Sequence, residues 1–525
     1  MAKASGFMKH FFGVSGAIFL SRILGLARVR LEAEILGGGA VASAWQLVSS
    51  YANILRRLLG EGALGTALTP IVAELDHEEG KAAVKGALAV VFPCLGIVLG
   101  AIVIFAALAA LIVGRFFTAE SNLRVYLVCT LLPIVMPYAI FICMTGVVTA
   151  VLNYGKRFVL PAFCSLLMNI ALVGGLALGW YWRESEGTLD IIKFLHILSY
   201  LFLLSGVIQM VLMFIQLKLL GFFPDFFSWR KHLGVLKKLW DLALPGFIGG
   251  AALQISFLID RNLALMINEQ GVASLGYVDR LVDLPIGIFG VAMGQVLMAR
   301  MSRSAANGDI GELAGEMNFA LRQLLFLCIP MAVGIFLFHE LMLKVICLGG
   351  AYTMENLNAA RRVCMFYGSG IPFFCALKII IPAFHARQDM ETPLRCSLIA
   401  IAVNLCLSIA LLKPLEQGGI ALATTVSAAL HIALLLYFLC RSGVNVEFRK
   451  VSGTLLRSIL VSVGAGAAAA FGLQRFYCGS GRLADFTALC IAGSVFGVLY
   501  LIGSWMTGSA EIKELLKRFS GKKSA

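Results

Sequence analysis

Charged side chains inside apolar stretches are the residues of this chain most suited to chemistry. They fall in three such stretches: Arg22 and Arg28, then Arg56 and Arg57, then Asp279, Arg280 and Asp283. A charge near the centre of a bilayer costs at least about 2.5 to 3.5 kcal/mol, so it normally faces a cavity or a partner. Arginine outnumbers acid here, and a guanidinium offers a fork of permanently charged donors that matches phosphate oxygens. These positions predict a cavity with unmatched cations that binds a diphosphate.

The same arginines have a simpler interpretation. Arg22 and Arg57 can reach the membrane interface with their long side chains, and Arg280 can pair with Asp283 one turn away. Arg22 and Arg28 lie about 120° apart around an ideal helix, so a kink near Gly25 or long side chains must bring them together. Both interpretations stay open at this stage.

Other polar residues in apolar stretches indicate weaker sites. Asp260, Asn404 and Thr424 could line a cation site with oxygen atoms, or simply be satisfied within a helix bundle. The histidines His196, His385 and His431 stand alone, and the thirteen cysteines form no C-x-x-C pair or metal-ligand spacing. We therefore expect no metal and no cofactor.

Composition decides which elements must position these residues. The chain has 525 residues, of which 60% are hydrophobic and 14% charged, against about 25% charged in soluble proteins. Apolar stretches of about 20 residues span a bilayer as helices. We expect an all-α polytopic membrane protein with about fourteen spans. They are predicted at residues 11–31, 41–66, 84–113, 123–152, 158–180, 193–217, 236–264, 273–299, 320–348, 360–386, 392–413, 418–440, 454–474 and 484–506.

The net charge of +14 is a topology signal. Lys and Arg are scattered between apolar stretches and form no dense basic face, so no nucleic-acid partner is expected. Alternate connections carry most of these cations, and membrane proteins keep such connections in the cytoplasm. Both termini share that side, which predicts a multi-pass protein with cytoplasmic ends.

A faint internal repeat suggests the domain organisation. Residues 152–161 and 384–393 each end a helix, make a short polar turn and place a proline near the start of the next helix. Internal repeats are common in transporters. The offset predicts a six-helix lobe at 1–225, a second at 226–445, and two further helices with a basic tail at 446–525.

Four motifs carry a resemblance to a known family. They are Ser21-Arg22-Ile23-Leu24-Gly25-Leu26-Ala27-Arg28, Asn53-Ile54-Leu55-Arg56-Arg57 with Glu61-Gly62-Ala63, Asp279-Arg280-Leu281 with Asp283 and Pro285, and Arg387-Gln388-Asp389 with Thr392-Pro393. In this order they resemble the signatures of the lipid II flippase MurJ (MviN) family, along about the whole chain.

The resemblance implies a fold and a function. The fold is that of the multidrug/oligosaccharidyl-lipid/polysaccharide (MOP) exporters, in which two six-helix lobes enclose a cationic cavity. The arginines that match Arg22, Arg28, Arg56 and Arg280 are implicated in holding the diphosphate of lipid II, and Ser21, Gly25, Arg57, Glu61, Asp279 and Asp283 match residues around them. It also implies a transporter in the bacterial inner membrane that works by alternating access, driven by the membrane potential or a monovalent cation. Membrane lipids, and proteins of cell-wall synthesis, are the further partners expected.

The chain departs from the family pattern at several acidic positions. Val29 stands where the family usually has Asp, Ser43 replaces a further acid, and Ser50 replaces a Lys. Ser408 stands where some relatives have an Asp of a sodium site. Ion pairing near the cavity is therefore expected to differ from that of the family.

Three other functions are compared with lipid II flipping. A flippase for another polyprenyl-diphosphate-linked glycan would share the fold. A cation-coupled multidrug antiporter should carry acids in its amino-terminal cavity, where this chain has arginines. A membrane glycosyltransferase needs a catalytic or metal cluster on a large aqueous loop, and none is predicted.

Overall fold

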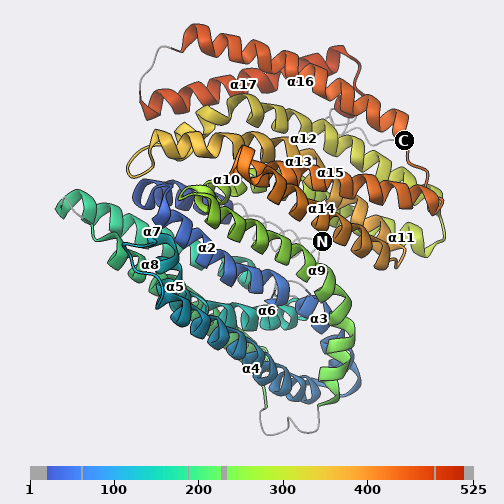
Figure 1. Ribbon diagram of the computed structural model, residues 1–525. Coiled ribbons are helices and arrows are strands. Elements are labelled where there is room, and N and C mark those ends of the chain that lie inside the picture. Colours follow the sequence, from blue (N-terminus) through green and yellow to red (C-terminus); the bar gives the residue numbers. More distant parts are fainter. Residues whose placement is uncertain are drawn as a thin grey trace. The chain divides into compact units, whose positions relative to one another are not determined.

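The computed structural model describes residues 20–60, 63–155, 157, 159–186, 189–225, 233–477 and 481–513, and most of these residues are helical (Figure 1). The only β-bridge in these ranges joins Gly349 and Tyr352. The predicted all-α class is confirmed.

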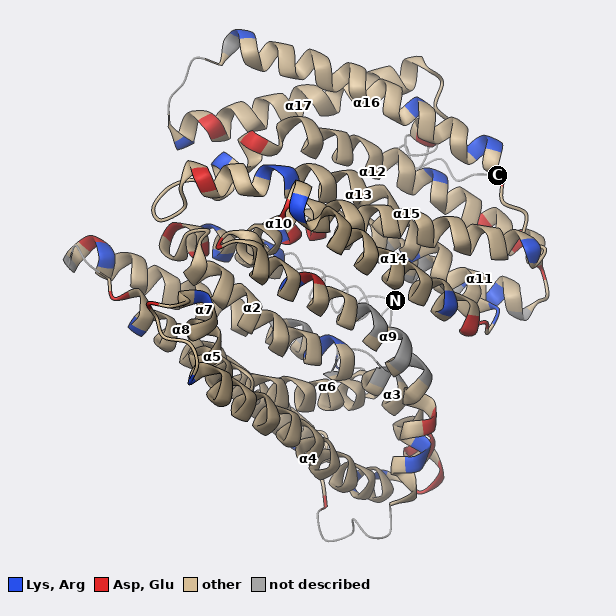
Figure 2. Cartoon of the chain, in the orientation of Figure 1, with Lys and Arg blue, Asp and Glu red and all other residues tan. Residues whose placement is uncertain are grey.

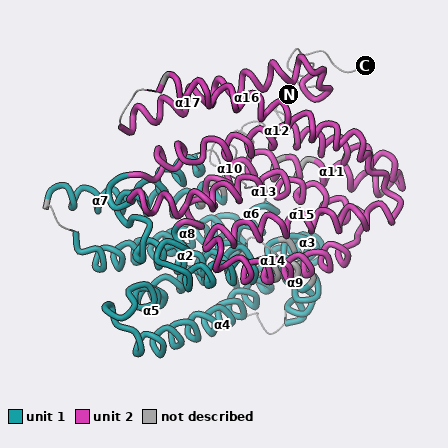
Figure 3. The backbone as a smooth tube through the Cα atoms, turned by 45° about the horizontal axis from the view of Figure 1, so that its top comes forward, with its two compact units in different colours: residues 1–273, 349–352 teal, residues 274–348, 353–525 magenta. Residues whose placement is uncertain are grey.

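The helices group into two units by their contacts (Figure 3). The first unit comprises Met1–Ala273 with Gly349–Tyr352, and the second comprises Ser274–Leu348 with Thr353–Ala525. In the first, a helix over residues 20–36 precedes α2 (Ala40–Leu55), η1 (Arg56–Gly60), α3 (Ala63–Glu78), α4 (Lys81–Gly114), α5 (Leu123–Val135), α6 (Tyr138–Tyr154), α7 (Val159–Glu186), α8 (Ile191–Leu219) and α9 (Gly234–Ile267). Helix α10 (Gly271–Pro285) crosses the boundary, and the second unit continues with η3 (Ile286–Val291), α11 (Ala292–Ala306), α12 (Ile310–Ile346), α13 (Met354–Ala386), α14 (Glu391–Leu415), α15 (Gln417–Arg441), α16 (Phe448–Phe476) and α17 (Arg482–Met506).

Long apolar helices make this a membrane protein. Within the described ranges, eight helices are long and apolar enough to cross a bilayer: α4, α8 and α12 to α17. The pair α5 and α6 adds a ninth span, bent by 42° at a break that contains Pro137. Figure 2 shows long tan stretches in α4 and α17, whose charged residues lie close to the helix ends. Few charges within long apolar helices are what a bilayer requires.

Two further predicted spans contain a π-helical segment. The span predicted at 41–66 comprises α2, the π-helical segment η1 and the start of α3. The span predicted at 273–299 likewise comprises α10, the π-helical segment η3 and part of α11. A π-helical segment inserts an extra residue per turn and is frequent at functional sites.

The two turns that suggested a repeat occupy equivalent places. One separates α6 from α7, and the other separates α13 from α14. The contacts, however, place α9 with the first unit, where it packs on α3 and α2. The predicted lobes, which end at residues 225 and 445, were defined by the internal repeat, whereas the two units are defined by contacts. The division into lobes therefore stays a prediction.

The last two helices pack on α12 in the second unit. Phe326 of α12 meets Phe496 and Tyr500 of α17 and two alanines of α16 in one apolar cluster. The Tyr500 hydroxyl donates to the Phe326 carbonyl oxygen at 2.7 Å. This bond satisfies a buried hydroxyl, which would otherwise be costly in an apolar surrounding.

Candidate substrate-binding site

Arg28 lies in a buried polar network of the first unit. Arg28 lies in the helix over residues 20–36 and is only 6% exposed. Its Nε lies 3.2 Å from Oε1 of Glu32, which is 1% exposed. Residues four apart share a helix face, so the helix carries its own counter-charge.

Helix α2 holds the Glu32 carboxylate from the other side. Trp45 Nε1–H donates to Oε1 at 3.1 Å, and Gln46 Nε2–H donates to Oε2 at 2.8 Å. Both donors are buried. Helix α2 therefore provides a hydrogen-bond donor to each oxygen of the carboxylate beside Arg28.

The guanidinium itself is less completely satisfied. Arg28 Nη1–H donates to Asn169 Oδ1 of α7 at 3.3 Å, and Asn169 Nδ2–H in turn donates to Ser21 Oγ at 3.3 Å. The Arg28 Nε–H contact with Glu32 is an ion pair whose geometry is not that of a hydrogen bond, and this buried N–H has no acceptor among the described residues. The network therefore joins Ser21 to Arg28 and leaves a donor available.

Arg28 is not an unmatched cation, because Glu32 pairs with it. Arg22, Arg56 and Arg280 each have an interaction as well. The physical reason is the cost of an isolated charge in a low-dielectric surrounding. The binding of a diphosphate by these four arginines stays a prediction. The sequence offered a signal for Glu32 in its i,i+4 spacing from Arg28, and Arg30 with Glu34 repeats that spacing as a second ion pair.

The other arginines of the amino-terminal motifs are less buried than Arg28. Arg22 is exposed near the start of the described helix, which runs without a break past Gly25. A Cβ added to Gly25 would meet nothing within 4 Å. Arg56 is half-buried and Arg57 exposed at the start of η1. Glu61 lies outside the described residues.

The acidic and basic residues of α10 belong to the second unit. Asp279, Arg280 and Asp283 are half-buried, and each has a partner. The π-helical segment η3 follows directly and packs on α13, where a Cβ on Gly290 would lie 3.2 Å from Cys375 Sγ. A π-helical segment thus contains Arg56 and Arg57 and another follows the Arg280 motif, and the sequence pattern did not indicate either segment.

The residues suggested for a cation site are only partly brought together. Asn404 Nδ2–H donates to Thr424 Oγ1 at 3.2 Å between α14 and α15. Asp260 is buried in α9 of the first unit, beside Arg261. In the described ranges, no three His, Cys, Asp or Glu residues gather as metal ligands.

An apolar cavity of about 510 Å³ lies in the first unit between α2, α4, α5 and α9. Its polar feature is Tyr51, whose hydroxyl donates to Asn262 Oδ1 at 2.8 Å. The predicted arginines of this unit are not among its lining residues. The cavity therefore has the chemistry of a hydrocarbon surface rather than of a diphosphate site.

Comparison with known proteins identifies the family. A family model described as lipid II flippase MurJ matches residues 32–489. A probable lipid II flippase MurJ of Rhizobium tropici is 32% identical over 445 residues, which cover 83% of this chain and 81% of that protein. The chain belongs to the lipid II flippase MurJ family.

Solved structures support the same fold. A lipid II flippase MurJ structure in an inward closed conformation matches with a TM-score of 0.75 and 23% identity, and covers 94% of this chain and 99% of that one. A multidrug resistance MATE family transporter of the MOP superfamily, in an inward-facing conformation, matches with a TM-score of 0.64 and 15% identity over 83% of this chain and 95% of that one. The predicted MOP exporter fold is confirmed.

Membership of the MurJ family settles two further predictions. MurJ proteins are transporters rather than enzymes, so the prediction of a transporter is confirmed. The apolar helices and the family together make this chain a multi-pass protein of the inner membrane.

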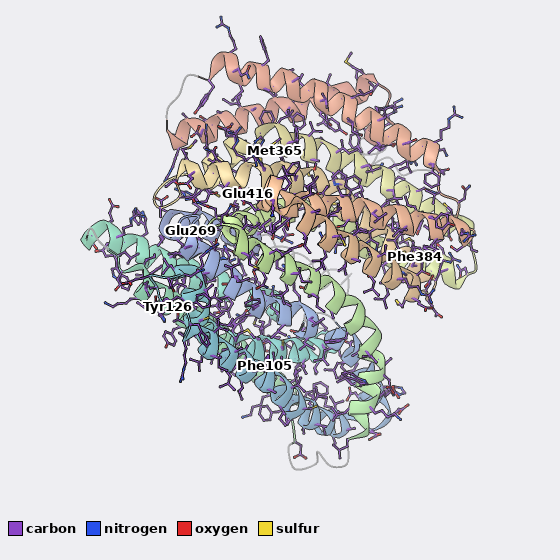
Figure 4. The ribbon with its side chains drawn as sticks, in the orientation of Figure 1. Phe105, Tyr126, Glu269, Met365, Phe384 and Glu416 are labelled. Atoms are coloured by element: carbon purple, nitrogen blue, oxygen red, sulfur yellow. The ribbon has the colours of Figure 1, made fainter. Side chains whose placement is uncertain are left out.

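The structure shows the surroundings of two residues, Val29 and Ser43, that depart from the MurJ pattern. Val29 is fully buried, and the neighbouring negative charge comes from Glu32, one turn further along the helix. Ser43 Oγ donates to the Glu269 carbonyl oxygen at 2.5 Å and accepts from Ala273 N–H at 3.1 Å, which ties α2 to the turn between α9 and α10. Glu269 is labelled in Figure 4. The hydroxyl thus satisfies backbone groups at that position.

Proposed function

We propose that this protein flips lipid II, or a closely related undecaprenyl-diphosphate-linked glycan, from the cytoplasmic to the outer leaflet of the inner membrane. Membership of the MurJ family supports the class of substrate. A diphosphate carries several negative oxygens, so its passage through an apolar layer requires charged donors inside the protein. The arginine-bearing motifs supply such donors.

One observation carries this proposal. Arg28 is buried in a membrane-embedded unit, and its Nε–H has no acceptor among the described residues. An unsatisfied buried donor on a permanent charge costs about 1 to 3 kcal/mol or more, so it is expected where a ligand supplies the acceptor. In the proposal Arg22, Arg28, Arg56 and Arg280 hold the diphosphate. Ser21, Gly25, Arg57, Glu61, Asp279 and Asp283 support or gate that site.

The transport cycle is proposed to be alternating access between the two leaflets. Both termini lie in the cytoplasm in this proposal, in agreement with the distribution of Lys and Arg. The membrane potential or a monovalent cation drives the cycle, and Asp260, Asn404 and Thr424 are the residues proposed for a cation. The lobes at 1–225 and 226–445 are the proposed moving parts, and proteins of cell-wall synthesis are proposed neighbours.

Growth rescue tests the function. The gene is expressed in bacteria depleted of their own lipid II flippase, as the wild type and as variants brought to equal membrane levels. Arg28→Ala alone leaves Glu32 buried without its partner, which can cost about 3 to 5 kcal/mol and unfold the protein. The informative variant is therefore Arg28→Gln with Glu32→Gln, which removes both charges together. Arg280→Ala tests the second unit, and Arg395→Ala, in an exposed ion pair with Glu391, is the matched control.

The outcomes separate the alternatives. Rescue by the wild type and Arg395→Ala, but not by the folded neutral pair or Arg280→Ala, supports diphosphate binding by the arginines. Rescue by the neutral pair contradicts a binding role for Arg28. Failure of a well-expressed wild type to flip lipid II in reconstituted vesicles moves the proposal to another polyprenyl-diphosphate-linked glycan.

A further inference from the structure

Glu32 lies in the position of a competing ligand for Arg28. Its carboxylate contacts the guanidinium at 3.2 Å, and both groups are buried. A substrate diphosphate that binds Arg28 must therefore share the guanidinium with this carboxylate or displace it. This inference rests on the proposed function, because it concerns the same arginine.

The contacts of Arg28 and Glu32 allow the ion pair to separate without loss of the hydrogen bonds to Glu32. The ion pair lacks hydrogen-bond geometry on the Arg28 Nε side, while Trp45 and Gln46 donate to the two oxygens of Glu32 from α2. If Arg28 turns toward another anion, Glu32 keeps both of these donors. The Glu32 carboxylate then keeps two hydrogen bonds and the guanidinium gains the charge of the incoming anion, so opening toward a ligand costs less than removing Arg28, which leaves the acid with no compensating charge.

A second ion pair on the same helix provides a comparison for Arg28 and Glu32. Arg30 and Glu34 also lie four residues apart, but they form a hydrogen-bonded pair and are more exposed. The two pairs therefore differ in burial, and Trp45 and Gln46 of α2 donate to the acid of the buried pair.

We propose that Glu32 is the internal anion that occupies Arg28 when no substrate is bound, and that the substrate diphosphate displaces it. A diphosphate has more negative charge and more acceptor oxygens than a carboxylate, so it binds the guanidinium in place of Glu32 while it is present. When the diphosphate leaves, Arg28 pairs again with Glu32, which Trp45 and Gln46 have held in place, and the pair is again neutral. Glu32 thus lowers the affinity for substrate and favours its release.

The experiment measures affinity for a diphosphate with and without this acid. Purified full-length protein in lipid nanodiscs is titrated with farnesyl diphosphate, and farnesol serves as the ligand without phosphate. Glu32→Gln keeps the size of the side chain and removes its charge. We expect it to bind farnesyl diphosphate about tenfold more tightly or better, in line with the coupling measured between close charge pairs. Farnesol binding should not change.

Two variants make the test specific. Glu34→Gln removes the same charge from the same helix and should leave the affinity for farnesyl diphosphate unchanged. The neutral pair, Arg28→Gln with Glu32→Gln, should bind farnesyl diphosphate more weakly than the wild type, because the gain from Glu32→Gln requires the Arg28 guanidinium. A purely structural role for Glu32 predicts a lower melting temperature of Glu32→Gln with no gain in affinity, so the two roles give different results.

The failures of the two proposals are distinguishable. Equal affinity in Glu32→Gln and the wild type, with weaker binding by the neutral pair Arg28→Gln with Glu32→Gln, overturns the role of Glu32 and leaves the proposed function intact. An equal gain in Glu34→Gln also overturns it, because the effect would then be one of overall charge. Absence of any binding of farnesyl diphosphate by the wild type contradicts both proposals.

Discussion

Arg28 and Glu32 show how single residues tolerate burial in a membrane-embedded unit. The guanidinium has an acid at i+4, a side-chain amide at Asn169, and one N–H without an acceptor. The acid in turn has two donors from α2. The stability of this region therefore depends on polar contacts as well as on apolar packing.

Removal of one of these donors should destabilise the protein. Gln46→Met keeps the length of the side chain but removes the N–H that bonds Glu32 Oε2 at 2.8 Å. An unsatisfied buried acceptor costs about 1 to 3 kcal/mol, so the melting temperature in detergent should fall. Gln474→Met, at an exposed position of α16, should change it little. If both variants melt alike, the hydrogen bond to Glu32 contributes nothing to stability.

The sequence predicted the arginines but missed their partners. Arg28, Arg56 and Arg280 stand out because apolar stretches rarely contain charge. Glu32 lies at i+4 from Arg28, whereas the family pattern places acids at the positions of Val29 and Ser43. Trp45 and Asn169 could not be found in this way, because uncharged residues become partners only when α2 and α7 pack beside the first helix.

At the scale of elements, close helix packing depends on small residues. Gly179 of α7 faces α8, and a Cβ there would lie 2.4 Å from the ring of the buried Phe194. Gly174 lies on the same helix, and a Cβ there would meet nothing within 4 Å. The two glycines therefore make a matched pair.

Substitution of these glycines by alanine should have opposite effects. Gly179→Ala should lower the free energy of unfolding by about 1 to 3 kcal/mol, because the packed core must shift. Gly174→Ala should raise it by about 0.5 to 1 kcal/mol, because alanine restricts the unfolded chain and favours the helix. Thermal unfolding of the two variants checks both signs. Equal loss in both would show that α7 and α8 do not pack at Gly179.

The segment after α17 is held to α16 by a buried acid outside the spans. Thr454 Oγ1–H donates to Glu511 Oε1 at 2.7 Å, and Ser509 Oγ–H donates to Oε2 at 2.8 Å. Burial opposes ionisation of Glu511, but these hydrogen bonds and the charge of Arg322 outweigh it and hold the pKa of the carboxyl below its usual range. The segment is therefore anchored by a carboxylate rather than by a carboxylic acid.

This anchoring should weaken in acid. Because the pKa of Glu511 is lower in the folded protein, the stabilisation is complete above the pKa of a free Glu, about 4.3, and is lost as the pH falls through the lower value. A spin label at Ala510→Cys, with the exposed cysteines replaced by Ser, should become more mobile between pH 6 and pH 3. Glu511→Gln should remove most of that pH dependence. A label equally mobile at both pH values would contradict the anchoring.

The elements themselves were largely predictable, and their interruptions were not. The length of each apolar stretch predicted a span, because about twenty consecutive apolar residues are typical of a transmembrane helix. The π-helical segments at Arg56–Gly60 and Ile286–Val291 escaped prediction. Such segments depend on how neighbouring helices pack, as at Gly290 against Cys375, and hydropathy carries no information on that.

At the scale of the whole molecule, the helices differ in how much apolar surface they leave to lipid. Only 17% of the apolar window of α4 is buried inside the protein, against 56% of that of α13. Phe105, which is labelled on α4 in Figure 4, is among the most exposed apolar residues. Apolar surface on this scale requires a hydrocarbon surrounding.

Labelling from within the bilayer should reproduce this difference. A carbene generated from an apolar diazirine dissolved in the membrane should modify α4 several-fold more than α13, because only α4 presents most of its side chains to lipid. Mass spectrometry of the peptides measures the ratio. After denaturation in detergent the two helices should label alike. Equal labelling in intact membranes would contradict the packing of α4 described above.

The pairing of Arg28 with Glu32 also bears on the electrical side of transport. Because both charges belong to one helix, any movement of that helix carries them together as a neutral unit. Moving one elementary charge across a potential of 100 mV is worth about 2.3 kcal/mol, but a neutral pair does no such work. In the proposed cycle, a bound diphosphate adds negative charge to this neutral pair. The proposal therefore predicts that the membrane voltage acts on the loaded pair and not on the empty one.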